Sequence, residues 1–119
     1  MNFEQFNRPW GFYINVINEN GYKVKKLTIN PNSRLSLQSH NHRSEHWTVI
    51  KGNPKIQVGG DKLNIEKNHH VYIPKKTLHR IENNTDDIVE IIEVQIGEYL
   101  EEDDIIRYED DYNRKILSK

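Results

Sequence analysis

Apolar and polar residues alternate along much of the chain, with the period of two that is typical of half-buried β-strands. Alternating or β-branched runs occupy residues 22–29, 36–42, 46–51, 55–58, 71–73 and 88–96, with a weaker run at 61–65. Turn-forming pairs such as Asn20-Gly21 and Gly59-Gly60 separate the runs. Short strands at this spacing predict an all-β sandwich or barrel of antiparallel strands. A parallel fold would need helical stretches between the strands, and none is evident before residue 97.

The segment after residue 97 differs from the rest, because acidic residues dominate it and are interleaved with isoleucine and tyrosine. A short helix or an extended strap would both suit this composition. The 119 residues are a size typical of one domain, so residues 1–119 are expected to form a single domain. There is no apolar signal sequence and no run of about 18 apolar residues, so we expect a cytoplasmic protein with no membrane partner.

Charge and cysteine content exclude several classes of function. The formal net charge of −1 provides no field that would attract nucleic acid, so no nucleic-acid partner is expected. The chain has no cysteine, which excludes a disulfide scaffold, a cysteine-ligated zinc site, an iron–sulfur cluster and a thiol nucleophile. All six histidines, however, lie between residues 40 and 79, and this clustering points to a site.

Two of the histidines, His40 and His42, are two residues apart, which is the spacing of side chains on one face of a strand. Alternate side chains of a strand share a face, so Gln38, His40 and His42 would project together. A hairpin would return Glu45 to the same face, and His79 begins another apolar run. Imidazole and carboxylate groups that converge on rigid strands form a site for zinc or another divalent first-row metal. Spacing alone favours His40, His42, Glu45 and His79 as the ligands.

The same segment resembles the first cupin motif, written G-x5-H-x-H-x(3,4)-E-x6-G. Glu45 and Gly52 fit its E-x6-G half, and counting back four intervening residues places His40 at the second histidine position. Gln38 then takes the first histidine position, and Asn32 takes the leading glycine. Asparagine tolerates the left-handed backbone conformation that such a glycine can adopt.

The second cupin motif, G-x5-P-x-G-x2-H-x3-N, matches further along the chain. Pro74, His79 and Asn83 agree with it, whereas Asn68 and Lys76 replace its two glycines. Asn68 is again a plausible replacement for a turn glycine.

The two motifs imply a ligand set that differs from the one favoured by spacing, namely Gln38, His40, Glu45 and His79. We prefer this set, which resembles the zinc ligands of phosphomannose isomerases, so Zn²⁺ is the expected metal. His42 then becomes a substrate contact or a replacement for Gln38.

Longer matches narrow the resemblance to the cupin domain of type II mannose-6-phosphate isomerases. They include R-P-W-G at residues 8–11, L-S-L-Q at 35–38, H-R-x-E-H-W at 42–47, V-Y-I-P at 71–74 and E-D-D-I-x-R at 102–107. All matches together cover residues 8–114. The resemblance implies a cupin jelly-roll barrel (RmlC-like), a homodimer, and interconversion of mannose 6-phosphate and fructose 6-phosphate through a cis-enediol. In that family the domain often follows a mannose-1-phosphate guanylyltransferase domain, and this chain resembles the isomerase domain alone.

The implied reaction moves a proton between C1 and C2 of the sugar and therefore needs a base. Glu93 is the first candidate, because Glu93 and Gln95 share one face of the last predicted strand and buried polar groups are costly unless they serve a site. Gln95 would then contact the substrate. The alternative is that the side chains of Glu93 and Gln95 both face solvent on an edge strand. His42 and Lys25 are rival bases, and burial would lower the pKa of a lysine.

The substrate phosphate needs cations, and arginine suits this role because its donors form a planar fork. Arg107 is the first candidate, supported by Lys25, while Arg34 has the strand parity of Gln38. The alternative function is a non-catalytic cupin module that binds a sugar phosphate or sugar nucleotide beside a separate guanylyltransferase. A third possibility, an iron dioxygenase, is disfavoured because Gln38 replaces the first histidine of the motif.

Overall fold

The structure is a computed structural model that describes residues 3–112 of the chain. Positions 113 and 114, the last two of the sequence resemblance, lie outside the described residues. Strands, turns and bends make up residues 3–112, which include no helix and hence none long and apolar enough to cross a membrane.

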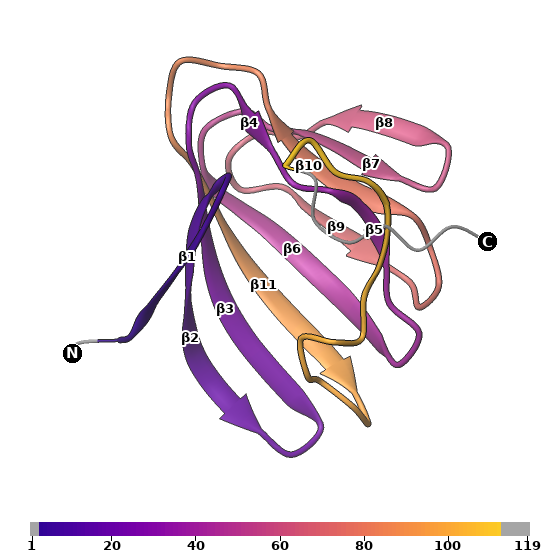
Figure 1. The fold of residues 1–119 in the computed structure, drawn as a ribbon. Coiled ribbons are helices and arrows are strands. Elements are labelled where there is room, and N and C mark those ends of the chain that lie inside the picture. The colour runs from indigo at the N-terminus through magenta and orange to yellow at the C-terminus, as the bar shows by residue number, and fades with distance from the viewer. Residues whose placement is uncertain (1–2, 113–119) are drawn as a thin grey trace.

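Two antiparallel sheets form the walls of a barrel (Figure 1). The first sheet contains, in spatial order, β1 (Gln5–Arg8), β2 (Gly11–Glu19), β3 (Tyr22–Ile29), β11 (Val89–Gly97), β6 (Arg43–Lys51) and β9 (His70–Ile73). The second contains β12 (Ile106–Glu109), β5 (Leu37–Ser39), β10 (His79–Asn83), β7 (Lys55–Val58) and β8 (Asp61–Asn64), and β4 (Ser33–Arg34) pairs with β10. The antiparallel all-β architecture predicted from the alternating pattern is confirmed.

The core lies between the two sheets and draws on both of them. Alternation along each strand turns one set of side chains inward, as in the buried positions of β6 and β11. The buried apolar cluster consists of Trp10, Tyr13, Leu27, Ile29, Trp47, Val49, Ile56, Val71, Ile73, Ile81, Val89 and Ile91. Buried polar side chains, among them Glu45, Glu93 and Gln95, share the barrel interior with this cluster.

The chain crosses from one wall to the other between β5 and β6. Strand β5 ends at Ser39 in the second sheet, and β6 begins at Arg43 in the first. The expected strand over residues 36–42 and the hairpin after it are therefore wrong. As a consequence, Glu45 on β6 approaches His40 from the opposite wall and not from a neighbouring strand.

The positions where the two cupin motifs lack glycine have left-handed backbone conformations. Asn32, Asn68 and Lys76 have φ angles of 54°, 77° and 62°. The expectation that asparagine replaces a turn glycine at residues 32 and 68 is confirmed. Lys76 adopts the same conformation without the local side-chain hydrogen bonding that favours asparagine there, so it carries the larger conformational cost.

The acidic C-terminal segment is an extended strap, which is one of the two forms expected for it. Residues 98–105 run from the end of β11 in the first sheet to β12 in the second (Figure 1). Lys23 and Lys25 on β3 hold this strap, because their Nζ atoms bind the carbonyl of Leu100 at 2.9 Å and the carboxylate of Glu102 at 2.6 Å. The strap is therefore fixed against the side chains of β3.

Candidate metal centre

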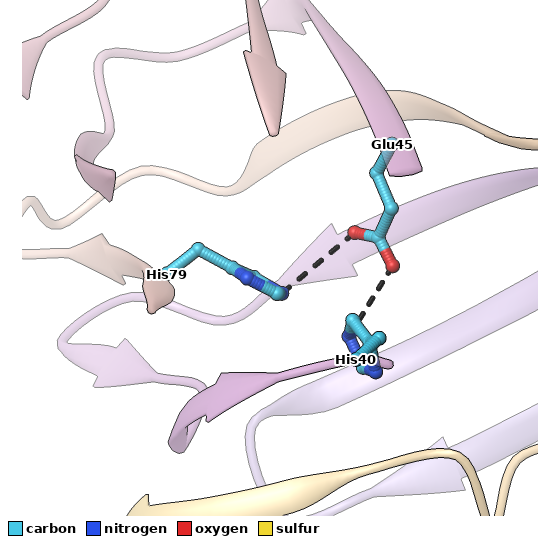
Figure 2. A group of neighbouring side chains, drawn as sticks. All are labelled: His40, Glu45 and His79. Atoms are coloured by element: carbon cyan, nitrogen blue, oxygen red, sulfur yellow. Dashed lines mark ion pairs between the residues drawn. The ribbon is translucent and has the colours of Figure 1, made fainter. Parts of the chain in front are cut away.

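Three buried side chains converge between the sheets, namely His40, Glu45 and His79. One donor atom from each lies within 4.8 Å of the others. The Nε2 atom of His40 is 3.3 Å from Oε2 of Glu45, and the Nε2 atom of His79 is 3.8 Å from Oε1 (Figure 2). Figure 2 shows each ring next to a different oxygen of the carboxylate. Two imidazoles and a carboxylate that face one point form a divalent-metal donor set.

Backbone carbonyls fix the orientation of both imidazoles. The Nδ1 atom of His40 lies 2.6 Å from the carbonyl oxygen of Asp104, and the Nδ1 atom of His79 lies 2.9 Å from that of Thr77. A carbonyl oxygen only accepts hydrogen bonds, so each Nδ1 carries the proton and each Nε2 presents its lone pair to Glu45. Metal-ligating histidines are held in the same way by groups that bind their second nitrogen.

Burial keeps both rings neutral. It lowers the pKa of His40 to about 3, and the guanidinium of Arg43 adds to this effect. It also lowers the pKa of His79 to about 4. A histidine must be neutral at the ligating nitrogen to bind a metal, so both are ready to ligate near neutral pH.

Gln38 lies next to this group on the second sheet. Its Cα faces that of His79 in the β5–β10 pair and that of Arg107 in the β5–β12 pair. Directly opposed residues of antiparallel strands share a face, so the three side chains form one row across the sheet. The amide nitrogen of Gln38 donates to the hydroxyl of Ser36 at 2.9 Å, which leaves the carbonyl oxygen as the atom suited to ligate a metal.

A cavity that is partly open to solvent lies beside the three-donor group. Half of the ten predicted site residues line it: Lys25, Gln38, Glu93, Gln95 and Arg107. Arg8, Tyr13, Arg43 and Glu102 complete its polar wall. Both a buried acid and several cations therefore face one cavity next to the candidate metal ligands.

Glu93 is buried on β11, as its alternation with Ile92 and Val94 predicts. Its carboxylate accepts hydrogen bonds from the indole nitrogen of Trp47 at 3.2 Å and from the amide nitrogen of Gln95 at 3.0 Å. Burial, together with the neighbouring carboxylate of Glu45, raises the pKa of Glu93 to about 7. A carboxyl group that changes protonation state near neutral pH is suited to acid–base chemistry.

Lys25 is also buried and faces inward, as its shared face with Leu27 predicts. Its ammonium lies 2.6 Å from Glu102 and 4.1 Å from the centre of the Tyr13 ring. The guanidinium of Arg8 contacts the same ring at 5.0 Å. Two cations, Lys25 and Arg8, thus lie against Tyr13 in the wall of the cavity.

His42 and Arg34 lie outside the cavity, contrary to the parity argument. The side chain of His42 is exposed against the ring of Tyr99, because residues 40–42 belong to the crossover and not to a strand. Arg34 forms two hydrogen bonds with the carboxylate of Asp111 at 2.7 and 2.8 Å. A break between β4 and β5 removes the alternation that was expected to link Arg34 to Gln38.

Sequence reasoning missed Arg43 and Asp104. Arg43 lies on the same strand face as Glu45 and Trp47. The predicted strand began at residue 46, three residues after the start of β6, and therefore did not include it. Asp104 gave no local signal, because it reaches His40 only through the folded strap. The other three histidines, expected to be bystanders, are exposed: His46, His69 and His70.

Comparison with known proteins agrees with this geometry. Over 107 residues, which are 90% of this chain, it is 44% identical to the xanthan biosynthesis protein XanB of Xanthomonas campestris pv. campestris. Over the same length it is 42% identical to the mannose-1-phosphate guanylyltransferase of Escherichia coli. The matches cover 23% and 22% of those proteins, so the chain spans less than a quarter of the relatives' length.

Solved structures show the same fold. An RmlC-like cupin from Shewanella frigidimarina superposes with a TM-score of 0.76 at 16% identity, covering 85% of this chain and 87% of that one. The barrel therefore has the cupin fold, as the two motifs predicted. Residues 1–110 match the family described as mannose-6-phosphate isomerase C-terminal, and with this match the chain belongs to that family.

Proposed function

We propose that this domain is a metal-dependent isomerase that interconverts mannose 6-phosphate and fructose 6-phosphate. The observation that supports it most is the pair of imidazoles, His40 and His79, which backbone carbonyls turn toward one buried carboxylate beside a polar cavity. The family description names this isomerase, and the name of the Escherichia coli relative concerns a mannose phosphate.

The metal would be held by His40, Glu45 and His79, with the side-chain oxygen of Gln38 as a fourth ligand. These nitrogen and oxygen donors fit the buried geometry described above, and we propose Zn²⁺ because it favours four such ligands. A bound divalent ion supplies a Lewis acid that polarises the substrate oxygen atoms.

Glu93 is the proposed base, because its buried carboxylate lines the cavity and two donors fix its position. In the forward direction, Glu93 removes the proton from C2 of the open-chain aldose, and the C1–C2 double bond of the cis-enediol forms. Glu93 then returns that proton to C1. The hydroxyl proton on O2 passes to O1, and the carbonyl forms at C2.

The phosphate would bind to three cations that line the cavity, namely Arg107, Lys25 and Arg8. Holding the phosphate there would use remote binding energy to orient the reacting carbons toward Glu93. A sugar phosphate therefore fits the cavity better than a neutral sugar would.

The test is a coupled assay that follows fructose 6-phosphate formed from mannose 6-phosphate by the purified, zinc-loaded chain. We expect turnover that EDTA abolishes and added Zn²⁺ restores. An isomerase carried over from the expression host could imitate this result. Glu45→Gln, purified in the same way, controls for it, because only activity from this chain would be lost.

The alternative, a non-catalytic module, has a distinct outcome. Binding of mannose 6-phosphate by calorimetry without turnover in a metal-loaded sample would reject the isomerase and support the binding module. Turnover that survives in Glu45→Gln would reject the proposed site.

A further inference from the structure

Arg43 is a buried cation between the three-donor group and the cavity. Its Nε donates a hydrogen bond to Oε2 of Glu45 at 2.8 Å, and its Nη2 lies 3.3 Å from Nε2 of His40. The side chain is only 6% exposed and also forms part of the cavity wall. Arg43 therefore contacts two of the three side chains that would ligate a metal.

The Nε2 atom of His40 can bind only one of two partners, Arg43 or a metal ion. Its Nδ1 carries the proton that the Asp104 carbonyl accepts, so Nε2 has a single lone pair. That lone pair receives either an N–H of Arg43 or a metal ion at roughly 2.0–2.1 Å. The carboxylate of Glu45 has spare lone pairs and forces no such choice. The conflict therefore lies at His40.

Two further features favour departure of the guanidinium when a metal binds. A divalent ion and Arg43 would repel each other strongly in a site from which water is largely excluded. In addition, Nη1 of Arg43 is buried without a hydrogen-bond partner among residues 3–112. A buried donor that is left unsatisfied makes the present position of the side chain costly.

We propose that Arg43 and the metal ion compete for His40, and that metal binding releases the Arg43 guanidinium into the cavity. Glu93 and Glu102 also line that cavity and can receive the displaced charge. There the planar fork of donors can bind the oxygen atoms of an anionic sugar ligand. This last step rests on the proposed function, whereas the competition itself does not require a sugar.

The experiment measures zinc affinity by competition with a chromophoric chelator, for the wild-type chain and for Arg43→Gln. Removing the competitor should tighten zinc binding by about tenfold, the scale of one charge-assisted hydrogen bond. A residue that merely positions Glu45 for the metal would give the opposite sign. Unchanged or weaker zinc binding in Arg43→Gln would therefore overturn the proposal.

Arg80→Gln is the matched control. Arg80 is equally buried, but its guanidinium binds the carbonyl of Leu35 at 3.0 Å and the carboxylate of Glu109 at 3.1 Å. We expect its zinc affinity to stay at the wild-type value. A similar tightening in both variants would show a general loosening of the barrel and would also overturn the proposal.

A measurement on the wild-type chain covers the case in which Arg43→Gln does not fold. The Nε–H signal of Arg43 can be identified in ¹H–¹⁵N spectra by its loss in Arg43→Lys. Exchange of this proton with water should be slow without metal and at least about tenfold faster after Zn²⁺ is added, because a released guanidinium loses the protection of its buried hydrogen bond. Unchanged exchange would contradict the release.

These results separate the inference from the proposed function. Tighter zinc binding by Arg43→Gln in a chain that lacks isomerase activity would support the competition and reject the isomerase. Isomerase activity together with unchanged zinc affinity in Arg43→Gln would support the isomerase and reject the competition.

Discussion

The carbonyl oxygen of Asp104 lies 2.6 Å from Nδ1 of His40, a residue 64 positions earlier in the chain. The carboxylate of Asp104 also accepts hydrogen bonds from the backbone amides of Asn41 and His42, both at 2.9 Å. Asp104 thus fixes the crossover that carries His40 and also the orientation of its ring. The strap between β11 and β12 is part of the candidate metal centre.

Asp104→Ala tests this coupling. The variant loses two charge-assisted hydrogen bonds, so the free energy of unfolding should fall by about 2 kcal/mol. Without these bonds, the carbonyl of residue 104 would be held less firmly against the ring of His40. Zinc affinity should therefore fall by about tenfold, as it does for other groups that orient metal-ligating histidines. Urea unfolding of the metal-free chain and chelator competition measure the two effects separately.

Asp103→Ala is the control for the strap itself. Asp103 is exposed and accepts a hydrogen bond from the hydroxyl of Tyr99. Both stability and zinc affinity should stay near their wild-type values. If Asp104→Ala lowered stability but left zinc affinity unchanged, the orienting role of Asp104 would be refuted.

His79→Ala tests the ligand set. Alanine removes the Nε2 that faces Glu45 and offers no donor atom in its place, so bound zinc and isomerase activity should both be lost. Elemental analysis of the purified variant gives the metal content directly. His70→Ala, which changes an exposed histidine on β9, should keep a full complement of metal. Stoichiometric zinc in His79→Ala would remove His79 from the set.

Local periodicity was enough to predict much of the barrel. β3 and β7 have the predicted bounds, and β11 differs from its prediction by one residue at each end. Within these strands, the alternation correctly predicted that Lys25 and Glu93 face inward. β2 was not predicted, and a bulge between Asn15 and Ile17 interrupts its alternation.

Alternation failed where the chain leaves a strand. It placed His42 inward and Arg43 in a turn, because nothing local shows that residues 40–42 cross between sheets. Contacts across long stretches of sequence, such as that of Lys25 with Glu102, were equally invisible.

Both predicted ligand sets contained His40, Glu45 and His79, which do converge. The motif register differed only in preferring Gln38, which lines the cavity, to His42, which is exposed.

Glu93→Gln tests the proposed base. The amide keeps the shape of the carboxylate but cannot take up the proton, so kcat should fall by at least about 100-fold, the lower end for loss of a general base. Zinc content and KM should change little, because Glu93 is not a proposed ligand of the metal. Steady-state kinetics together with elemental analysis check both expectations.

Glu90→Gln is the matched control on the same strand. Glu90 lies on the partly exposed stretch of β11, 3.6 Å from Lys26, and does not line the cavity. Its kcat should stay near the wild-type value. A near-normal kcat in Glu93→Gln would exclude Glu93 from the proton transfer and favour Lys25 as the base.

Lys76→Gly tests the cost of the left-handed residue beside the site. Lys76 has a φ of 62° and stands at a glycine position of the second cupin motif. An L-residue with a Cβ pays about 1 kcal/mol or more for this conformation, whereas glycine does not. The free energy of unfolding should therefore rise by about 0.5–1 kcal/mol, after the larger entropy of the unfolded glycine chain is subtracted. Urea unfolding of the metal-free chain measures this change.

The neighbouring Lys75→Gly separates backbone conformation from the loss of a lysine side chain. Both residues are exposed, but Lys75 does not have a positive φ, so glycine brings only its entropic cost and should lower stability by about 0.5–1 kcal/mol. Zinc affinity should not change in Lys76→Gly, because the amide of residue 76 still donates to the carbonyl of His40 at 2.7 Å. Equal destabilisation by both substitutions would show that the left-handed turn costs this chain nothing. Opposite signs would show that the turn beside His40 is kept at a cost in stability that glycine would remove.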